Sequence, residues 1–430
     1  MRRNDDVMYD TLLFDLDGTL TESAPGIMRS AKIAVDKLGY TDYDPQVFGR
    51  FIGPPLHSSF QEHFGMDDAQ AQEAVRLYRE YYTVRGLYEN AVYTGMPNLL
   101  RRLRAGGARL LVATSKPQVF AERILAHFGL LRFFERVVGS SLTDRDAGKE
   151  ELVRIALPAD AGRAAMIGDR CFDIAGGQAN GIDTIAVGYG YGSREEFVQA
   201  GATHIVDTVA ALGDLLAPDT PVPPGFFLTV EGLDGSGKTT QMQALADHLA
   251  QNGYEVVRTR EPGGTKVAEE IRDVVLSPRN LGMCAVTEAL LYAAARAEHV
   301  HAVVRPALAA GKVVLCDRFV DSSAVYQGGG RGLGIEQVLA INAPAVGTTL
   351  PDATVYLRLD ARTALQRRIS ATAPDRIELE DEKFHQRVFE VYDELAARFP
   401  ERIHVVDATQ PIEAIAEQAR AAVDAALARR

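Results

Sequence analysis

Tryptophan is absent from this sequence of 430 residues, and cysteine occurs only three times, as Cys171, Cys284 and Cys316. No two of these cysteines are close in sequence, so neither a disulfide framework nor a zinc knuckle is indicated, and a reducing cytoplasm fits best. No apolar run approaches the roughly 18 residues of a membrane span, and the polar Asn4–Asp6 stands where a secretory signal would be apolar. We therefore expect a soluble, cytoplasmic protein.

Positive charge is also scarce. Lysine and arginine together number 46 against 58 acidic residues, which leaves a net charge of -12. A surface of that balance offers no general attraction to nucleic acid. Any phosphate-bearing ligand must therefore be captured by a local arrangement of residues, and we expect neither a nucleic-acid partner nor a membrane partner.

Apolar residues are plentiful, at 47%, which is ample for buried cores. A length of 430 residues exceeds one ordinary core, and a value of about 150 residues per domain favours two or three domains. The segment 217–225 carries four prolines and no hydrophobic periodicity, as expected of a semi-rigid linker. We predict two domains, 1–216 and 226–430, joined by this linker.

Both predicted domains alternate helical periodicity with short apolar runs that are often β-branched. Such runs are typical of strands buried on both faces, which occur in parallel sheets covered by helices. Seven of them are Thr11–Phe14, Leu110–Ala113, Ala164–Ile167, Thr184–Val187, Phe226–Val230, Val313–Cys316 and Thr354–Leu357. We therefore predict an α/β protein with two doubly wound parallel sheets, whose ligands bind beyond the carboxyl ends of the strands.

The first motif follows the first strand and contains two aspartates, Asp15 and Asp17, within the run Phe14–Thr19. A strand period of two puts both carboxylates on one side, where they repel each other unless a cation lies between them. Magnesium is the natural choice, because it accepts one or two carboxylates and leaves positions for water and phosphate. Asp15 could then attack phosphorus, and Asp17 could protonate the leaving oxygen.

Three further signals follow in order along the first half. The run Val112–Lys116 ends a strand with a hydroxyl, Lys149 follows a polar stretch, and Ile167–Asp169 ends another strand with Asp173 one helical turn later. An Asp-x-Asp-Gly turn alone is ambiguous, since Asp and Gly favour turns for conformational reasons. In this combination, residues 9–216 resemble the haloacid dehalogenase superfamily of phosphatases.

This resemblance implies a Rossmann-like domain with a magnesium-dependent active site. It implies that Asp15 is the nucleophile and Asp17 the general acid, and that Thr114 and Ser115 bind the phosphate. Lys149 would be the cation that stabilises nucleophile and phosphate. Asp15, Asp17 and Asp169 would bind magnesium, and Asp173 would support these ligands without binding the metal. An insertion at about 22–93 would be a helical cap that closes over the substrate.

Two motifs, Phe51–Leu56 and Gly188–Ser193, look like the phosphoglycolate phosphatase and 5'-nucleotidase branch of that superfamily. The substrate within the branch stays open. A second reading also stays open, in which the domain keeps the fold but serves as a non-catalytic scaffold or regulatory module.

The second half opens with a strong phosphate-binding motif. After the strand Phe226–Val230, the run Gly232–Thr239 fits the eight-position phosphate-loop pattern in full. Glycines let the backbone amides curl inward, and the following helix offers its positive end. We predict that this loop binds phosphate, with Thr239 also on magnesium, through Gly232, Asp234, Gly235, Ser236, Gly237, Lys238, Thr239 and Thr240.

Asp317 and Arg318 follow another buried strand, Val313–Cys316. The acid can act on magnesium or its waters, and the planar guanidinium binds phosphate oxygens in pairs. Phosphoryl transfer depends mostly on positioning and charge neutralisation. We therefore predict Lys238, Asp317 and Arg318 as catalytic residues of a phosphate-loop kinase or another NTPase.

Further motifs indicate which molecule accepts the phosphoryl group. They are Thr259–Thr265, Ile271–Arg272, Leu291–Arg296, Tyr326–Gly332 and Asp375–Glu378. Together with the loop they resemble thymidylate kinase from residue 226 to near the end. This resemblance implies ATP as co-substrate, Mg²⁺ as cofactor, transfer to dTMP and a homodimer, with an acceptor site made of Tyr292 stacked on thymine, Arg272, Arg296, Arg318 and Gln327.

The lid region departs from that family. Relatives whose loop lacks a basic residue usually carry several lid arginines, but here the loop has Ser236, and the lid offers Arg367, Arg368 and Arg376 around an uncharged stretch. We predict Arg368 or Arg376 as the arginine that stabilises the transferring group. A kinase for another nucleoside monophosphate is the alternative. His299 has no partner at ligand spacing and is interpreted as a packing residue.

Overall fold

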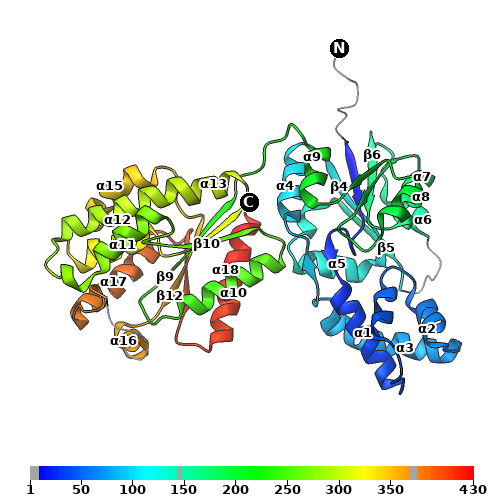
Figure 1. Cartoon of the computed structure of the whole chain (residues 1–430), viewed down its shortest axis with the longest axis horizontal. Coiled ribbons are helices and arrows are strands. Elements are labelled where there is room, and N and C mark those ends of the chain that lie inside the picture. Colours follow the sequence, from blue (N-terminus) through cyan, green and yellow to red (C-terminus); the bar gives the residue numbers. More distant parts are fainter. Residues whose placement is uncertain (1–8, 143–147, 369–374) are drawn as a thin grey trace, which may run out of the picture. The chain divides into compact units, whose positions relative to one another are not determined.

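The computed structural model of the chain describes residues 9–142, 148–368 and 375–430, which fall into two compact units (Figure 1). The amino-terminal unit comprises Met1–Pro221 with Gln251–Tyr254, and the carboxyl-terminal unit comprises Val222–Ala250 with Glu255–Arg430. The division after Pro221 falls inside the proline-rich segment. Each unit contains one parallel sheet and its own buried core.

The sheet of the amino-terminal unit has six strands in the order β5-β4-β1-β6-β7-β8, all paired in parallel. Their bounds are Thr11–Phe14 (β1), Arg109–Pro117 (β4), Arg136–Ser140 (β5), Ala164–Gly168 (β6), Asp183–Val187 (β7) and His204–Val206 (β8). The chain builds outward from β1 through β4 to β5 and then returns to β6 on the other side of β1. The carboxyl ends of β1 and β6 therefore form the crevice where a ligand is expected.

An antiparallel pair, Thr21–Glu22 (β2) and Ala91–Val92 (β3), connects this sheet to a helical cap. The cap contains α1 (Ala24–Lys37), α2 (Leu56–Phe64) and α3 (Asp68–Tyr81), a 3-10 turn at Pro45–Phe51 and a π turn at Tyr82–Gly86, all drawn in blue in Figure 1. Its core is aromatic, and the ring of Phe51 lies 4.9 Å from that of Phe60. The other helices of the unit flank the sheet: α4 (Met96–Ala105), α5 (Gln118–His127), α6 (Lys149–Ala156), α7 (Cys171–Ala179), α8 (Arg194–Ala200) and α9 (Val209–Leu216).

The sheet of the carboxyl-terminal unit has five parallel strands in the order β10-β11-β9-β12-β13. Their bounds are Phe226–Glu231 (β9), Val256–Arg260 (β10), Val313–Asp317 (β11), Ala353–Arg358 (β12) and Ile403–Asp407 (β13). The first strand, β9, is buried along its whole length between β11 and β12. The two parallel sheets confirm the predicted α/β fold class.

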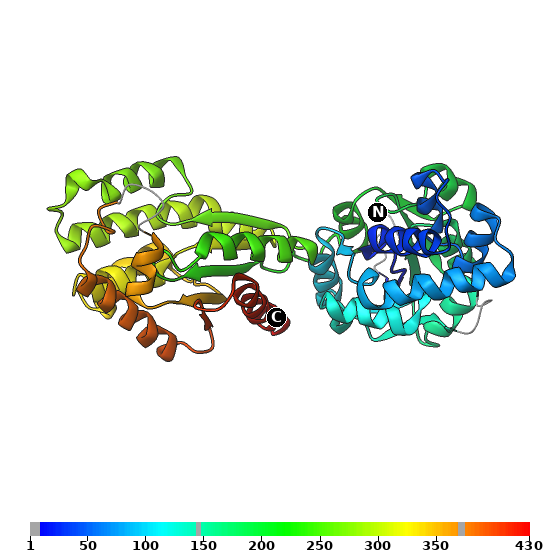
Figure 2. The same cartoon turned by 90° about the horizontal axis from the view of Figure 1, so that it is seen from below.

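Helices lie on both sides of this second sheet (Figure 2). They are α10 (Lys238–Gln251), α11 (Lys266–Leu276), α12 (Ala285–His299), α13 (Arg305–Ala309), α14 (Val320–Ser323), α15 (Ile335–Val346), α16 (Ala361–Arg368), α17 (Glu382–Arg398) and α18 (Ile412–Ala428), with π turns at Val300–Val304 and Ala324–Gly330. Across the described ranges, none of the helices combines the length and apolar composition that a membrane crossing needs.

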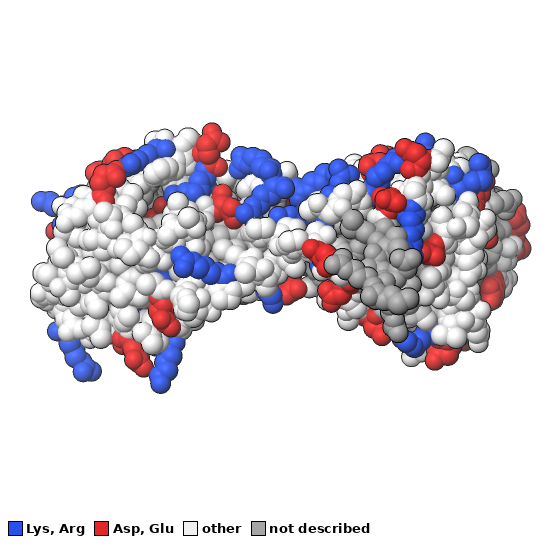
Figure 3. Space-filling model, turned by 90° about the horizontal axis from the view of Figure 1, so that it is seen from above, with Lys and Arg blue, Asp and Glu red and all other residues white. Residues whose placement is uncertain are grey.

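Charges of the two signs are interspersed on the face of the molecule drawn in Figure 3. Lys and Arg side chains there stand beside Asp and Glu, and a large area carries neither sign.

Candidate functional sites

Three acidic side chains meet at the crevice of the amino-terminal sheet. Asp15 directly follows β1, Asp169 directly follows β6, and Asp173 lies in the first turn of α7. All three are buried, and each offers a carboxylate oxygen within 4.8 Å of the others. The loop after β1 approaches them closely, since a Cβ at Gly18 (φ +79°) would stand 2.1 Å from Asp169 Oδ2. Only glycine fits that position.

Lys149 joins this acidic cluster from the start of α6. Its Nζ lies 2.7 Å from Asp15 Oδ1 and 2.7 Å from Asp173 Oδ1. Burial disfavours the charged lysine, but the two carboxylates outweigh burial and raise the pKa of Lys149. One lysine therefore faces three acids.

The third carboxyl group, that of Asp169, lies where its charged form is disfavoured. Burial, together with the charges of Asp15 and Asp173, raises the pKa of Asp169 to about 8. Its Oδ1 is buried and has no hydrogen-bond partner among the described residues, whereas Oδ2 accepts a hydrogen bond from the Tyr191 amide at 2.8 Å. Hard oxygen ligands in such a cluster fit a divalent cation such as Mg²⁺.

Asp17 lies apart from this cluster, which differs from the sequence prediction that its side chain shares the metal with Asp15. Its Oδ2 instead pairs with Lys116 Nζ at 2.8 Å, while Asp173 takes the third place beside Asp15 and Asp169. The physical reason is that β1 ends at Phe14. The two aspartates stand in a turn, where the alternation of a strand no longer applies.

Thr114 and Ser115 occupy the carboxyl end of β4, the strand beside β1. Thr114 is buried, and its Oγ1 accepts a hydrogen bond from the Lys116 amide at 3.2 Å. Ser115 is exposed. Lys116, which the sequence interpretation used only as the end of a motif, also contacts the hydroxyl of Tyr82 in the cap. It therefore connects the cap with Asp17.

In the carboxyl-terminal unit, the loop Gly232–Thr239 connects β9 to α10. A Cβ at Gly235 (φ +89°) would stand 2.3 Å from the carbonyl oxygen of Ala364, so the loop needs glycine there. Lys238 Nζ donates to the carbonyl oxygens of Gly232 at 3.1 Å and Leu233 at 3.0 Å. Burial, with the charge of Arg318, lowers the pKa of Lys238.

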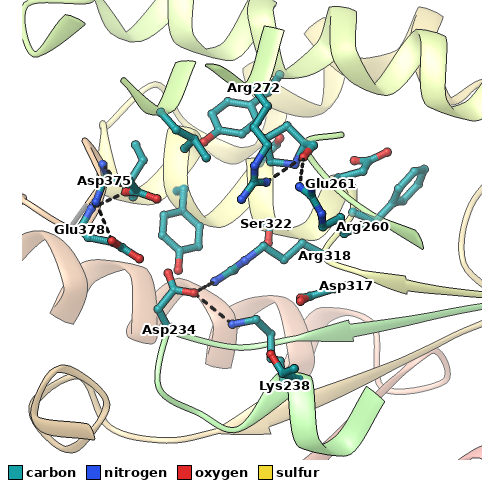
Figure 4. Close-up of a pocket in the computed structure, with 18 of the residues that line it drawn as sticks. Asp234, Lys238, Arg260, Glu261, Arg272, Asp317, Arg318, Ser322, Asp375 and Glu378 are labelled. Atoms are coloured by element: carbon teal, nitrogen blue, oxygen red, sulfur yellow. Dashed lines mark hydrogen bonds and ion pairs between the residues drawn. The ribbon is translucent and has the colours of Figure 1, made fainter. Parts of the chain in front are cut away.

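Asp234 in this loop attracts two cations, Lys238 at 3.3 Å and Arg318 at 2.8 Å, and Figure 4 shows both pointing toward it. Burial alone would raise the pKa of Asp234, but the charges of Arg318 and Lys238 outweigh it and hold that pKa well below its usual range. Arg318 has φ 68°, a backbone conformation that only a well-determined site maintains. Beside it, Asp317 Oδ1 is buried without a partner among the described residues and fits a cation or its waters.

A cavity of about 440 Å³ opens beside the loop. Asp234, Gly235, Gly237, Lys238 and Thr239 line it on the loop side, together with Asp317 and Arg318. Ser236 is buried within the loop, and Thr240 is exposed on α10; neither residue lines the cavity.

Four of the predicted acceptor residues, Arg272, Tyr292, Arg296 and Gln327, also line this cavity. Arg272 Nη1 donates to the Pro262 carbonyl at 2.8 Å and keeps further donors for a ligand. Figure 4 shows Arg272 near Arg260 and Glu261. The structure thus brings the phosphate loop and the predicted acceptor residues to one site.

Arg296 is more constrained than the sequence indicates. It is almost fully buried, and its guanidinium donates to Glu261 Oε2 at 2.7 Å, to Ser323 Oγ at 3.0 Å and to the Phe319 carbonyl at 3.1 Å. Glu261 is held in turn by His299 Nδ1 at 2.8 Å. His299, interpreted from the sequence as a packing residue, is thus part of a buried polar network.

The predicted lid arginines are placed differently from one another. Arg376 is buried, with Nη1 2.7 Å from Glu288 Oε2 and Nε donating to the Val275 carbonyl at 2.8 Å, and it does not line the cavity. Its guanidinium is therefore held against Glu288 rather than in the cavity lining. Arg368 ends α16, and its side chain lies outside the described residues. Arg367, which the sequence interpretation does not favour, does line the cavity.

Two buried glutamates with a positioning role were missed by the sequence interpretation. Glu231 accepts hydrogen bonds from the Phe319 amide at 2.8 Å, Ser322 Oγ at 2.6 Å and Tyr392 at 2.8 Å, which holds the segment that follows Arg318. The second is Glu288, which is fully buried and lies 2.7 Å from Arg376 Nη1. Glu231 ends a buried apolar strand, which is the same signal that drew attention to Asp317, and so it could have been found.

In comparisons with known proteins, the sequence patterns of two families match this chain. The sequence pattern of the family described as thymidylate kinase matches residues 230–419, and that described as haloacid dehalogenase-like hydrolase matches residues 12–187. Thymidylate kinase of Exiguobacterium sibiricum is 53% identical over 191 residues, which are 44% of this chain and 90% of that protein. Thymidylate kinase of Symbiobacterium thermophilum is 50% identical over 204 residues, which are 47% of this chain and 95% of that protein.

The amino-terminal half also has relatives among solved structures. The crystal structure of a protein described as a predicted phosphatase, from Clostridium acetobutylicum, is 43% identical and covers 48% of this chain and 98% of its own, with a TM-score of 0.45.

Proposed function

The chain belongs to the thymidylate kinase family through its carboxyl-terminal unit and carries a haloacid dehalogenase-like hydrolase domain in front of it, and from this premise we propose that it has two phosphoryl-transfer activities. The carboxyl-terminal unit phosphorylates dTMP with ATP. The amino-terminal unit hydrolyses a small phosphomonoester. The observation that carries the proposal is the presence in each unit of a set of charged side chains suited to phosphate at the carboxyl ends of parallel strands.

In the kinase reaction, the γ-phosphoryl group of ATP passes to an oxygen of the dTMP phosphate. The bond between this phosphorus and the bridging oxygen of ADP breaks, and a phosphorus–oxygen bond to dTMP forms, which gives ADP and dTDP. Lys238 and the loop amides bind the ATP phosphates, while Arg318 neutralises the oxygens of the transferring group. Magnesium held near Thr239 and Asp317 would supply additional positive charge.

The acceptor is bound at the other end of the same cavity. Arg272 contributes positive charge for the acceptor phosphate, and Tyr292 contributes an aromatic face on which a base can stack. The guanidinium of Arg296 is held by Glu261 and Ser323, so it forms a fixed part of the cavity lining.

In the phosphatase reaction, an oxygen of Asp15 attacks phosphorus, and the ester bond breaks as Asp17 donates its proton to the leaving oxygen. Asp17 then takes a proton from water, which attacks the phosphorus and breaks the bond to Asp15, so that inorganic phosphate leaves. Lys149 orients Asp15, and Thr114 follows Val112, the partner of Phe14, on the neighbouring strand β4. Magnesium at Asp15 and Asp169 would neutralise the phosphate oxygens as Asp15 approaches.

The kinase proposal is tested by an acceptor panel. Purified full-length protein is incubated with ATP, Mg²⁺ and one of dTMP, dUMP, dCMP, dAMP or dGMP, and ADP formation is followed by a coupled assay. We expect dTMP to be the best acceptor. Equal rates across the panel would instead favour a general nucleoside monophosphate kinase, and no ADP with any acceptor would reject kinase activity.

The phosphatase proposal is tested by phosphate release from a broad set of phosphomonoesters, with phosphoglycolate, dTMP and dUMP among them. We expect at least one to be hydrolysed with Mg²⁺ and to lose that hydrolysis in Asp15→Asn. No Asp15-dependent release from any member of the set would favour a scaffold or regulatory module.

A further inference from the structure

The lining of the kinase cavity changes character along its length. Lys238 and Arg318 supply positive charge at the phosphate loop, where both pair with Asp234, whereas Tyr292 supplies an aromatic face. Gln327, in the π turn Ala324–Gly330, is the one carboxamide among the described residues that line this cavity. Because a carboxamide offers one donor group and one acceptor, its orientation decides which hydrogen-bonding edge of a base it can read.

A buried carboxylate sets that orientation. Gln327 Nε2 donates to Glu288 Oε1 at 2.8 Å. A carboxylate has only acceptors, so the NH₂ group of Gln327 must be the one that faces it, whatever way the amide is built. No donor in the described part of the chain is hydrogen-bonded to the side-chain oxygen of Gln327, Oε1. That oxygen is therefore available to a ligand.

Glu288 is well held for this task. It is fully buried, and two guanidinium groups neutralise it, Arg331 Nε at 3.1 Å and Arg376 Nη1 at 2.7 Å. It also precedes Tyr292 by four residues on α12, so the two side chains lie on one face of the helix. The carboxylate thus stands directly behind the part of the cavity that offers an aromatic surface to a base.

We propose that Glu288 determines which pyrimidine is accepted, by fixing the Gln327 amide so that its side-chain carbonyl oxygen faces the cavity. This inference rests on the proposed nucleotide kinase function. A fixed acceptor pairs with the N3–H of thymine or uracil but meets the N3 lone pair of cytosine. One unpaired buried polar group of this kind lowers kcat/KM by roughly 10-fold to 100-fold. Glu288 is then a positioning residue, and Gln327 is the residue that touches the base.

The test compares dUMP with dCMP, because both lack the 5-methyl group and differ on the edge that Gln327 reads. For the full-length protein we expect a kcat/KM ratio of dUMP to dCMP of at least roughly 10. In Glu288→Gln the neighbouring amide can pair with Gln327 in either orientation, so this ratio should fall roughly 10-fold while the KM for ATP stays the same. An unchanged ratio would overturn the proposal.

Matched variants separate orientation from stability. Arg331→Gln removes an ion pair with Glu288 but keeps the carboxylate, so it should lower the melting temperature and leave the ratio unchanged. In Gln327→Ala the ratio should fall, and adding Glu288→Gln to it should cause no further fall. If Glu288→Gln does not fold, Glu288→Asp withdraws the carboxylate from Gln327 and should lower the ratio in the same direction.

The outcomes also separate this proposal from the kinase function itself. Absence of dTMP phosphorylation in the unaltered protein would reject the proposed function. A protein that phosphorylates dTMP, yet keeps its dUMP to dCMP ratio in both Glu288 variants, would reject only the role of Glu288.

Discussion

The candidate sites of the two units contain charged side chains in opposite proportions. In the amino-terminal unit, three carboxylates, of Asp15, Asp169 and Asp173, surround the single cation of Lys149. In the carboxyl-terminal unit, two cations, Lys238 and Arg318, surround the single carboxylate of Asp234. The first arrangement suits a divalent cation, whereas the second suits an anion such as phosphate.

This difference arises from the residues directly after the first strand of each sheet. After β1 the chain places a carboxylate at once, that of Asp15, which we propose as the nucleophile. After β9 the chain makes a glycine loop that leads into α10, so backbone amides and a helix end meet the ligand. We therefore expect the same position in two parallel sheets to support two chemistries, each of which can be removed without the other.

The largest effect is expected from Asp15→Asn. It removes the attacking oxygen, so phosphate release should fall by at least about 10⁴-fold, while dTMP phosphorylation stays unchanged. Steady-state assays of both activities on one preparation measure this. Asp160→Asn, at an exposed position paired with Arg109, is the matched control and should alter neither activity. A parallel loss of kinase activity in Asp15→Asn would contradict the independence of the two sites.

Lys238→Ala is the reciprocal change. Without the buried ammonium, the ATP phosphates lose one of their main donors, and kcat of the kinase should fall by about 10²- to 10³-fold. Phosphate release by the other unit should not change. Lys383→Ala, at an exposed position of α17, serves as the control. Wild-type kinase turnover in Lys238→Ala would mean that the loop is not the ATP site.

Substitutions of Arg367 and Arg376 should have different effects, the first on catalysis and the second on the stability of the kinase unit. Arg367→Gln should lower kcat by roughly 10- to 100-fold, since this side chain lines the cavity near the loop. Arg376→Gln should instead lower the free energy of unfolding by about 3 kcal/mol, because it breaks a buried pair with Glu288. Turnover numbers and urea denaturation distinguish the two. The reverse pattern would restore Arg376 as the lid arginine.

The smallest effect concerns pH. Burial, with the charge of Asp321, raises the pKa of Glu231 from 4.5 to about 7. Between these two values the folded state binds more protons than the unfolded state, so the free energy of unfolding should fall as pH rises, by roughly 3 kcal/mol in all. Glu231→Gln should flatten this dependence in urea denaturation at pH 5 to 8. The exposed Glu413→Gln is the control, and equal slopes in all three proteins would contradict the assignment.

The sequence predicts the interior strands of both sheets and overlooks the edges. All seven predicted runs are interior strands, whereas the four strands at sheet edges, β5, β8, β10 and β13, carry no run that the sequence analysis recognises. The reason is burial. The interior strand β9 is buried at every residue, whereas β10 alternates between partly buried and exposed residues and so lacks a continuous apolar run.

The candidate sites, too, can be predicted from the sequence only in part. Motifs next to interior strands, such as those of Asp15 and Asp317, are recognisable because a charged residue ends an apolar run. The contacts of Asp17 and Arg376 are not predicted from the sequence, because their partners Lys116 and Glu288 are roughly 90 to 100 residues away along the chain. Spacing along the chain carries no information on such pairs, and only the folded structure brings them together.

A single time course of ATP, Mg²⁺ and dTMP with the full-length protein, followed by phosphorus NMR, tests the central claim most directly. We predict that dTDP and ADP form in equal amounts, and that Lys238→Ala abolishes both signals while Asp15→Asn leaves them intact. ADP without dTDP, or dTDP formation that survives Lys238→Ala, would contradict the assignment of dTMP phosphorylation to the phosphate loop.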